Sequence, residues 1–242
     1  MIESPLIDPI KYSVNKIAKI AGILYLLIIV VGVFAELSRG KLVVSGDATA
    51  TANNIMASQL KWRLGIWADL FMHLCDIPLM LIFYFLLKPV HKNLALLAML
   101  FTLIQTAVMV STKLNLFMPI FLSSNADYLK AFEPGQLNAL MYLSIKSDGF
   151  GFGIGLLFFG FTCIVNGFLI IRSSYLPKTL GVMLQIAGLC YLVNSFALIL
   201  GPEFEKIISP AILLPCFVGE LSLCLWLLIK GVNTAKWNKQ VN

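Results

Sequence analysis

The stretch WRLGIWADLFMHLCDIPLMLIFYFLLK, Trp62 to Lys88, decides the fold class. It is long and apolar enough to cross a bilayer, which takes about 20 predominantly apolar residues in a helix. It nevertheless carries three polar residues, Asp69, His73 and Asp76, at positions i, i+4 and i+7. On a helix these positions form one stripe on one face. Because a charge in hydrocarbon is costly, the stripe predicts a helix that turns this face to other helices or to a wet cavity.

The composition of the whole chain indicates a membrane protein. Of 242 residues, 59% are hydrophobic and 12% are charged, whereas about 25% of residues are charged in an average soluble domain. The net charge of +6 comes from Lys and Arg at the ends of apolar spans, where lipid headgroups and membrane insertion explain it. It is therefore not a nucleic-acid signal, and the predicted partner is the lipid bilayer.

Apolar runs separated by polar loops predict an all-α, polytopic bundle of six transmembrane helices, packed as one domain over residues 16–232. The predicted spans are 17–37, 62–87, 93–122, 149–171, 178–200 and 209–230. Residues 1–15 form a predicted surface segment, and residues 233–242 form a predicted cytoplasmic tail. The first apolar run also resembles a secretory signal sequence, but its polar N-terminal region is long and further spans follow, which favours a membrane helix.

Polar loops between spans predict short surface helices. Asp47 is a suitable N-cap before ATATANNIMAS, and Pro134 suits the first position of a second helix. A run of alternating glycines then opens the fourth span at Gly149, Gly151, Gly153 and Gly155. No GK[ST] follows, so the run is not a phosphate loop, and its spacing indicates close packing between helices.

Six spans place both termini on one side of the membrane. That side is predicted to hold ten of the 18 Lys and Arg residues, and the longer loops on the other side hold seven. The ten are Lys11, Lys16, Lys19, Lys88, Lys92, Arg172, Lys178, Lys230, Lys236 and Lys239. By the positive-inside rule, both termini are predicted to be cytoplasmic.

Polar groups from several spans fall at similar depths. At a rise of about 1.5 Å per residue, Asp76 lies about 18 Å and Glu220 about 15 Å from the outer ends of their spans, near mid-membrane. Lys113 reaches the outer third, and two further acids lie near the outer boundary. The candidate intramembrane cluster comprises Asp69, His73, Asp76, Lys113, Glu220, Glu36 and Asp148. It predicts a polar cavity that opens to the outside and is floored by Asp76 and Glu220.

Three functions are compatible with such a cluster. In the first, a small proton- or ion-linked transporter or sensor uses Asp76 and Glu220 as titrating groups and His73 as a relay. In the second, a membrane-embedded enzyme acts on a lipid through acid–base chemistry by Asp69, His73 and Asp148. In the third, the protein is a structural subunit, and buried pairs such as Lys113 with Asp69 only hold helices together.

No metal or other cofactor is expected. Asp69, His73, Asp76 and Glu220 would form an oxygen-rich ligand set. However, the chain has two histidines, of which the other is His91 in a loop, and it has no HExxH motif. A small molecule or an ion remains a possible partner, and the sequence carries no indication of oligomeric state.

Four blocks resemble the bacterial family named domain of unknown function 4386. In chain order they are KIAGILYLLIIVVGVFAEL, GFGFGIGLLFFGF, YLPKTLGVMLQIAGLCYLVNSFAL and GELSLCLWLLIKGV. The resemblance covers residues 16–232 and implies a multi-pass protein of the bacterial inner membrane, with no established activity, substrate or cofactor. It also implies that relatives often carry histidine at the positions of Asp148 and of Thr162 or Cys163, so this chain lacks histidines that a metal site would use.

Overall fold

The computed structural model describes residues 13–124 and 126–241, with the backbone alone at residues 202–206, 209 and 210. The described part is all-α, as predicted, and no strand occurs in it. In chain order its elements are α1 (Val14–Gly40), α2 (Ala48–Ala57), α3 (Gln59–Leu87), α4 (Lys92–Thr112), α5 (Leu114–Leu122), the 3-10 helix η1 (Asp127–Ala131), α6 (Pro134–Arg172), α7 (Lys178–Leu200), α8 (Pro202–Ile229) and α9 (Thr234–Val241). Within these residues, six segments are long and apolar enough to cross a membrane, which confirms the predicted six-span class.

The six spans form a closed ring. In the order α1, α3, α4, α6, α7, α8, each span packs mainly against its two neighbours, and α8 returns to pack against α1. This order is the order of the chain, because the connections between successive spans are short or carry only small helices. A ring of this kind places the inward faces of all six spans around one common interior.

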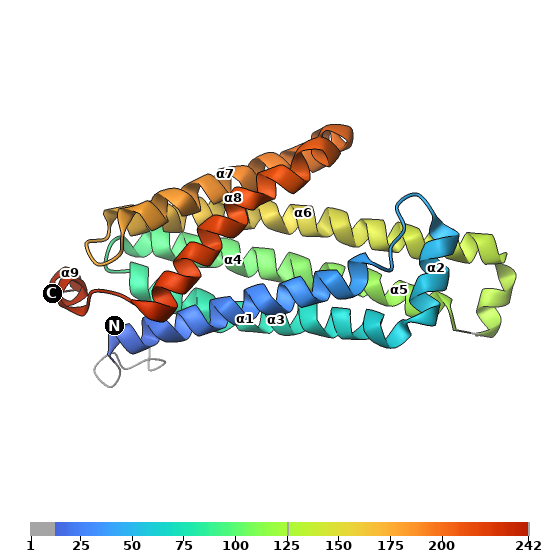
Figure 1. Ribbon diagram of the computed structural model, residues 1–242, viewed down its shortest axis with the longest axis horizontal. Coiled ribbons are helices and arrows are strands. Elements are labelled where there is room, and N and C mark those ends of the chain that lie inside the picture. The colour runs from blue at the N-terminus through green and yellow to red at the C-terminus, as the bar shows by residue number, and fades with distance from the viewer. Residues whose placement is uncertain (1–12, 125, 242) are drawn as a thin grey trace.

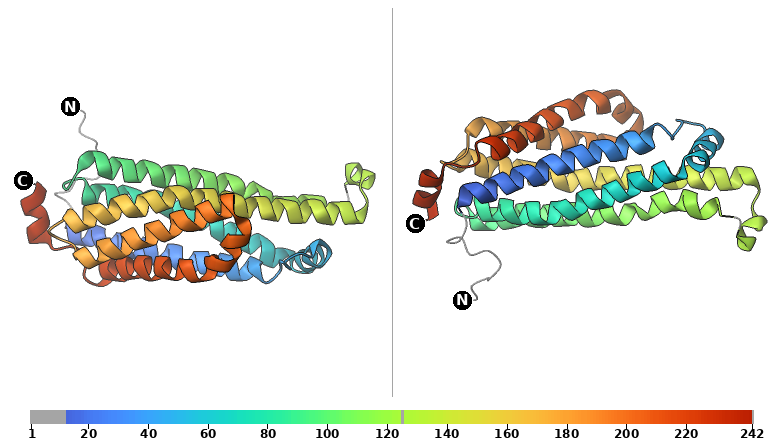
Figure 2. Two further views of the ribbon diagram at one scale, coloured as in Figure 1. Left: turned by 90° about the horizontal axis from the view of Figure 1, so that it is seen from above. Right: turned by 60° about the horizontal axis from the view of Figure 1, so that its bottom comes forward.

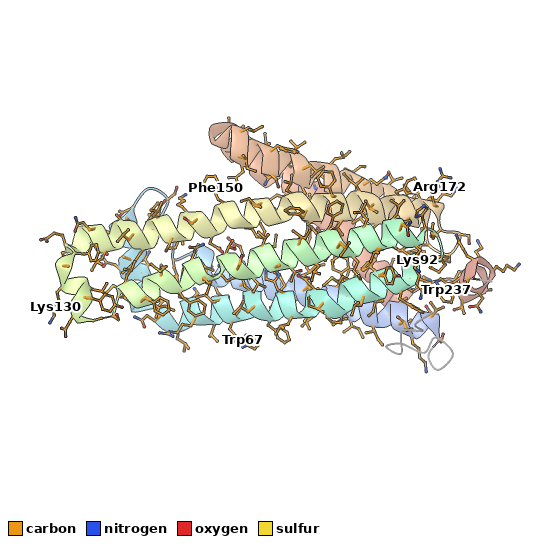
Figure 3. All side chains as sticks on the ribbon, turned by 180° about the vertical axis from the view of Figure 1, so that it is seen from behind. Trp67, Lys92, Lys130, Phe150, Arg172 and Trp237 are labelled. Carbon is orange, nitrogen blue, oxygen red and sulfur yellow. The ribbon has the colours of Figure 1, made fainter. Side chains whose placement is uncertain are left out.

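The bundle has two distinct ends, which Figure 1 shows at left and right. The terminal end holds both described chain ends and the α3–α4 and α6–α7 turns, and Lys92, Arg172 and Trp237 lie there (Figure 3). The distal end holds α2 and η1, with Lys130 at its tip (Figure 3). Since α7 has 23 residues and a helix rises about 1.5 Å per residue, it is about 34 Å long, close to the hydrocarbon thickness of a bilayer.

The outer surface of the bundle is apolar. Large side chains are exposed on several spans, such as that of Leu74 on α3 and those of Val193 and Phe196 on α7. Soluble monomers rarely expose apolar surface on this scale. Lipid is the environment in which such a surface is stable, which agrees with the predicted membrane class.

Glycines set the closest helix contact, between α6 and α7. A Cβ atom added at Gly167 would lie 2.6 Å from the carbonyl oxygen of Gly181, and one added at Gly188 would lie 2.6 Å from that of Gly160. Both helices space these glycines seven residues apart, so the antiparallel backbones touch at two levels. Small residues allow such close approach in membrane helices.

The predicted glycine run also serves packing. Gly151 lies against Thr112, Gly155 lies against Met109, and Gly153 lies against Leu198, whereas a Cβ at Gly149 would meet nothing within 4 Å. The run therefore joins α6 to α4 on one side and to α7 on the other, as its spacing indicated.

Helix α8 diverges from its neighbour α1. The two helices meet at the terminal end, where Gly22 packs against the backbone of Leu228 and Cys224 Sγ lies 3.5 Å from the Gly22 carbonyl oxygen. Figures 1 and 2 show them separating toward the distal end, where the α7–α8 hairpin stops and α6 continues. The ring is thus tightest at its terminal end.

Element boundaries differ from the prediction in four places. The third span breaks into α4 and α5 at Lys113, and the surface helix beginning at Pro134 continues without a break into the fourth span. Helix α8 begins at Pro202, before the predicted 209, because Pro suits a first helical position. The predicted tail forms α9, which Trp237 anchors by packing against Phe85. Of the predicted surface segment 1–15, residues 1–12 lie outside the described part of the chain, and α1 begins at Val14.

Candidate functional site

Four buried charges from four helical segments form an ionic cluster near the distal end. Arg39 of α1 places Nη2 2.6 Å from Asp69 Oδ2 of α3. Lys113, between α4 and α5, places Nζ 3.0 Å from Asp148 Oδ1 of α6 and 3.5 Å from Asp69 Oδ2. The exposed fractions of the four side chains lie between 5% and 11%. Two cations and two carboxylates balance, which is the condition under which buried charges are tolerated.

Local structure explains how the cluster assembles. Lys113 lies at the break between α4 and α5, where its backbone is helical but the regular ladder is interrupted. Gly65 lies one turn before Asp69 on α3, and a Cβ there would lie 2.6 Å from Arg39 Cγ. The missing side chain at Gly65 therefore makes room for the stem of Arg39.

Glu220 of α8 is held by two tyrosines from neighbouring spans. Tyr25 of α1 donates its hydroxyl to Glu220 Oε2 at 3.0 Å, and Tyr191 of α7 donates to Glu220 Oε1. The carboxyl group thus joins three helices through neutral donors. Among the described residues, no Lys or Arg forms an ion pair with it.

Asp76 and His73 form a second polar pair, one turn apart on α3. His73 Nδ1 lies 3.0 Å from Asp76 Oδ2, and Thr106 of α4 donates to the same oxygen at 3.4 Å. His73 is buried. Both contacts fall on Oδ2, so Oδ1 has no hydrogen-bond partner among the described residues.

A pocket of about 170 Å³ lies inside the ring and contains both carboxyl groups. His73, Asp76 and Glu220 line it, with further polar groups and a majority of apolar ones. Gln105 lines it too, and the buried Oε1 of Gln105 has no partner among the described residues. The other lining residues are Tyr25, Ile28, Met72, Leu79, Met80, Phe83, Tyr84, Ala95, Met99, Thr102, Met109, Phe152, Leu156, Phe159, Thr162, Cys163, Asn166, Leu184 and Leu223.

The ionic cluster lies one helical turn distal to this pocket. On α3, Asp69 precedes the pocket residue His73 by four positions. On α6, Asp148 precedes Phe152 by the same spacing, and Lys113 follows Met109 by four positions. Residues four apart on a helix lie one above the other. The cluster therefore stands between the pocket and the distal end of the bundle.

The seven predicted residues do not form one cluster. Asp69, Lys113 and Asp148 belong to the ionic cluster, and the predicted pairing of Lys113 with Asp69 is present. His73, Asp76 and Glu220 line the pocket. Glu36 is exposed on α1, forms no ion pair with a described residue and lies outside the pocket lining. The other six residues thus divide into two groups of three. Asp69 and Asp148 lie against Arg39 and Lys113, whereas Asp76 and Glu220 form no ion pair with a described Lys or Arg.

Three important residues were missed by sequence reasoning. Arg39 is one of the seven Lys and Arg residues assigned to the outer side, yet the candidate cluster contains five acids and one Lys, an excess of acids that indicates a missing buried cation. Tyr25 and Tyr191 lie within apolar spans at depths that match Glu220, and a buried hydroxyl needs a partner. Neither contact could be predicted from the sequence, because both depend on how α1 and α7 pack against α8.

The pocket places groups together that can form hydrogen bonds and can carry a proton. Within residues 13–124 and 126–241, no group of three or more His, Cys, Asp or Glu side chains is placed to hold a metal ion. The pocket carboxyl groups instead meet hydroxyls and an imidazole. Such groups can hold, donate or exchange a proton in the interior of a membrane protein.

Comparison with known proteins gives a family and one curated relative. A profile of the family described as "Domain of unknown function (DUF4386)" matches residues 20–231. An "Uncharacterized protein" of Archaeoglobus fulgidus is 28% identical over 156 residues, which cover 64% of this chain and 76% of the relative. No solved structure matches the chain. Since the family profile spans most of the sequence, this six-span protein belongs to the DUF4386 family.

Proposed function

We propose that this protein is a small proton-linked transporter or sensor, in which Asp76 and Glu220 bind protons inside the central pocket and His73 relays them. The observation that carries the proposal is the placement of two carboxyl groups, from the second and the last span, in one pocket. Ionisable groups deep in a membrane protein are costly and are usually kept for function.

The polar contacts around these groups support proton exchange. Asp76 Oδ2 and His73 Nδ1 are 3.0 Å apart, so a proton can pass directly between these two atoms. Glu220 is fixed by Tyr25 and Tyr191, whose hydroxyls stabilise the carboxylate yet carry no charge of their own. Protonation is then the simplest way for Glu220 to lose its charge in an apolar setting.

The ionic cluster fits the role of an outer gate. It lies between the pocket and the distal end, and its pairs join α1, α3, α6 and the α4–α5 break. Parting these pairs would open the pocket along the bundle axis. Buried pairs with two alternative arrangements are a known basis for switching between states.

The two other functions have less support. A lipid-acting enzyme would need Asp69 or Asp148 as a free acid or base, but both lie against cations. A purely structural role accounts for the ionic cluster, which balances its own charges. It does not account for Asp76 and Glu220, which line a pocket without a Lys or Arg among its described lining residues.

The proposed setting is the inner membrane of a bacterial cell, with both termini in the cytoplasm and the distal end outside. The distribution of Lys and Arg supports this orientation. A reporter enzyme fused after Asn242 should be active inside the cell. If the fusion were active only outside, the distal end and the ionic cluster would face the cytoplasm, and the proposed orientation would be wrong.

Infrared difference spectroscopy of the purified full-length protein tests the proposal, because it detects the C=O stretch of protonated carboxyl groups without knowledge of a substrate. We expect a carboxyl band that changes with pH and is lost in Glu220→Gln, and a second lost in Asp76→Asn. Glu36→Gln is the matched control, since Glu36 is exposed and outside the pocket. Spectra in which neither pocket variant removes a pH-dependent band would refute proton binding there.

A further inference from the structure

We infer that the pocket binds a small organic cation, namely a protonated amine carried on an apolar or aromatic body. The inference rests on the proposed function and names the class of molecule whose binding is linked to protons. Four features of the pocket carry it: its charge, its free acceptors, its apolar lining and its position beside lipid.

The charge of the pocket favours a positive ligand. Asp76 and Glu220 both line it, and no Lys or Arg occurs among its described lining residues. In the ionic cluster, Arg39 is paired with Asp69 and Lys113 with Asp148. A buried carboxylate without a countercharge is unfavourable. A bound cation would supply that countercharge, whereas an anion would add to the imbalance.

Free hydrogen-bond acceptors point the same way. Gln105 is buried, and its Oε1 has no hydrogen-bond partner among the described residues. The Oδ1 atom of Asp76 is also free of recorded partners, while its Oδ2 accepts from Thr106. Leaving a buried acceptor unpaired is costly. An ammonium group has three donors and no acceptor, so it matches a pocket that offers acceptors.

The rest of the lining is suited to an apolar body. Four of the nine methionines of the chain, Met72, Met80, Met99 and Met109, line the pocket. Methionine is flexible and polarizable, and it adapts to ligands of different shape. A metal ion would need several ligands held close together, and among the described residues no group of three or more His, Cys, Asp or Glu is placed to hold one.

Aromatic rings add a second reason for an organic cation. Tyr25, Phe83, Tyr84, Phe152 and Phe159 all line the pocket. The faces of aromatic rings attract cations, and the attraction grows when water is excluded. The same rings contact an apolar or aromatic body, so both halves of the ligand find partners.

Glu220 lies on the side of the pocket where α8 faces α1. The residue is intermediate in exposure, and α1 contacts α8 at Glu220 through Tyr25 and nearer the terminal end through Gly22. Toward the distal end the two helices diverge (Figures 1 and 2). Amines with apolar bodies dissolve in bilayers, so they would reach this side of the pocket without passing the ionic cluster.

The proton and the cation would compete for the same carboxyl groups. A bound ammonium favours the ionised carboxylates, and a bound proton removes the charge that holds the ammonium. The titratable groups that line the pocket or contact the carboxyl groups are Tyr25, His73, Tyr84, Cys163 and Tyr191. None of these is a permanent cation that would replace the ligand.

Calorimetric binding of three probes to the full-length protein in detergent tests the inference. The probes are 2-phenylethylammonium, 2-phenylethanol and 3-phenylpropanoate, which share an aromatic body and differ in charge. We expect the ammonium to bind at least about tenfold more tightly than the alcohol, and the anion to bind more weakly than both. Glu220→Gln and Asp76→Asn should each lower ammonium affinity about tenfold, with little effect on the alcohol and no effect from Glu36→Gln.

Asp76→Asn and one further variant, Tyr191→Phe, keep the test decisive if Glu220→Gln does not fold. Tyr191→Phe retains the Glu220 carboxyl group and removes one hydrogen-bond donor to it, so this variant should still bind the ammonium more tightly than the alcohol. The loss of ammonium affinity in Asp76→Asn tests the inference without Glu220→Gln. Three results would overturn the inference. They are equal affinity for the ammonium and the alcohol, an ammonium affinity that is unchanged in both Glu220→Gln and Asp76→Asn, and no binding of any probe. If the carboxyl groups titrate but no ammonium binds, the proposed function stands and the inference falls. If the ammonium binds selectively but no carboxyl band responds to pH, proton linkage falls instead.

Discussion

At the scale of single residues, the molecule treats its buried carboxyl groups in two ways. Asp69 and Asp148 lie against Arg39 and Lys113, so their charges are balanced within the protein. Asp76 and Glu220 meet a histidine and hydroxyl groups instead. The first pair is suited to hold helices together, and the second is suited to respond to a proton or a ligand.

The first prediction concerns the ionic cluster. Asp148→Asn should lower the free energy of unfolding by about 3–5 kcal/mol, because it leaves Lys113 buried without its closest countercharge. Asp127→Asn is the matched control: Asp127 pairs with Lys130 at 2.6 Å, but these side chains are 93% and 75% exposed. Surface pairs contribute about 0–1 kcal/mol, so the control should change little. Thermal unfolding in detergent compares the two, and equal losses would show that burial of the cluster does not matter.

Residue-level prediction from the sequence was partial for a physical reason. Depth along a span follows from the helical rise, which is why Lys113 and Asp69 could be paired in advance. The direction of a side chain around its helix depends on which neighbour packs there. Glu36 therefore looked similar to Asp148 in depth, although it is exposed and Asp148 is buried. Arg39 was missed for the opposite reason: its position in the sequence indicates an outer loop, but it lies at the end of α1 and its side chain reaches Asp69 of α3.

At the scale of elements, backbone contacts between glycines position the pocket wall formed by α6. Gly160 and Gly167 bring α6 onto α7, and Gly155 brings it onto Met109 of α4. Because α6 contributes Phe159, Cys163 and other residues to the pocket, its distance from α7 and α4 sets the width of the interior. Packing in lipid has no hydrophobic driving force between helices, so such close contacts matter more.

The second prediction follows from these contacts. Gly167→Ala should destabilise the protein by about 1–3 kcal/mol, because its Cβ would lie 2.6 Å from the Gly181 carbonyl oxygen and the backbone would have to shift. Gly149→Ala, on the same helix, should cause no loss, since a Cβ there meets nothing within 4 Å. Denaturation of both variants in detergent measures the difference. A similar loss in both would mean that the α6–α7 contact is looser than described.

Elements were predicted from the sequence with uneven success. Long apolar runs between polar loops are a strong signal, and the Asp47 cap before α2 is present, with Ala50 N donating to Asp47 Oδ1 at 2.8 Å. The missed features are those that tertiary contacts decide. Helix α6 runs on through polar residues because its distal half packs against α2 and α5. The tail forms α9 because Trp237 finds a place beside Phe85.

At the scale of the whole molecule, the closed ring is what turns scattered polar residues into a site. Asp76 and Glu220 are separated by most of the chain, and they come together because α8 returns to α1. The sequence could place both near mid-membrane, but ring order and closure are tertiary properties that depth does not determine. The polar residues predicted to line one cavity lie in two groups, the pocket and the ionic cluster, one helical turn apart.

The account depends on one claim, that Asp76 and Glu220 make a shared acidic pocket which small molecules can reach. Cys163 lines this pocket and is a built-in reporter in a variant whose other four cysteines are replaced. We predict that cationic 2-aminoethyl methanethiosulfonate modifies Cys163 at least about tenfold faster than anionic 2-sulfonatoethyl methanethiosulfonate, and that adding Asp76→Asn with Glu220→Gln removes this preference. Equal rates for the two reagents, or a preference that persists in the doubly substituted protein, would contradict the account.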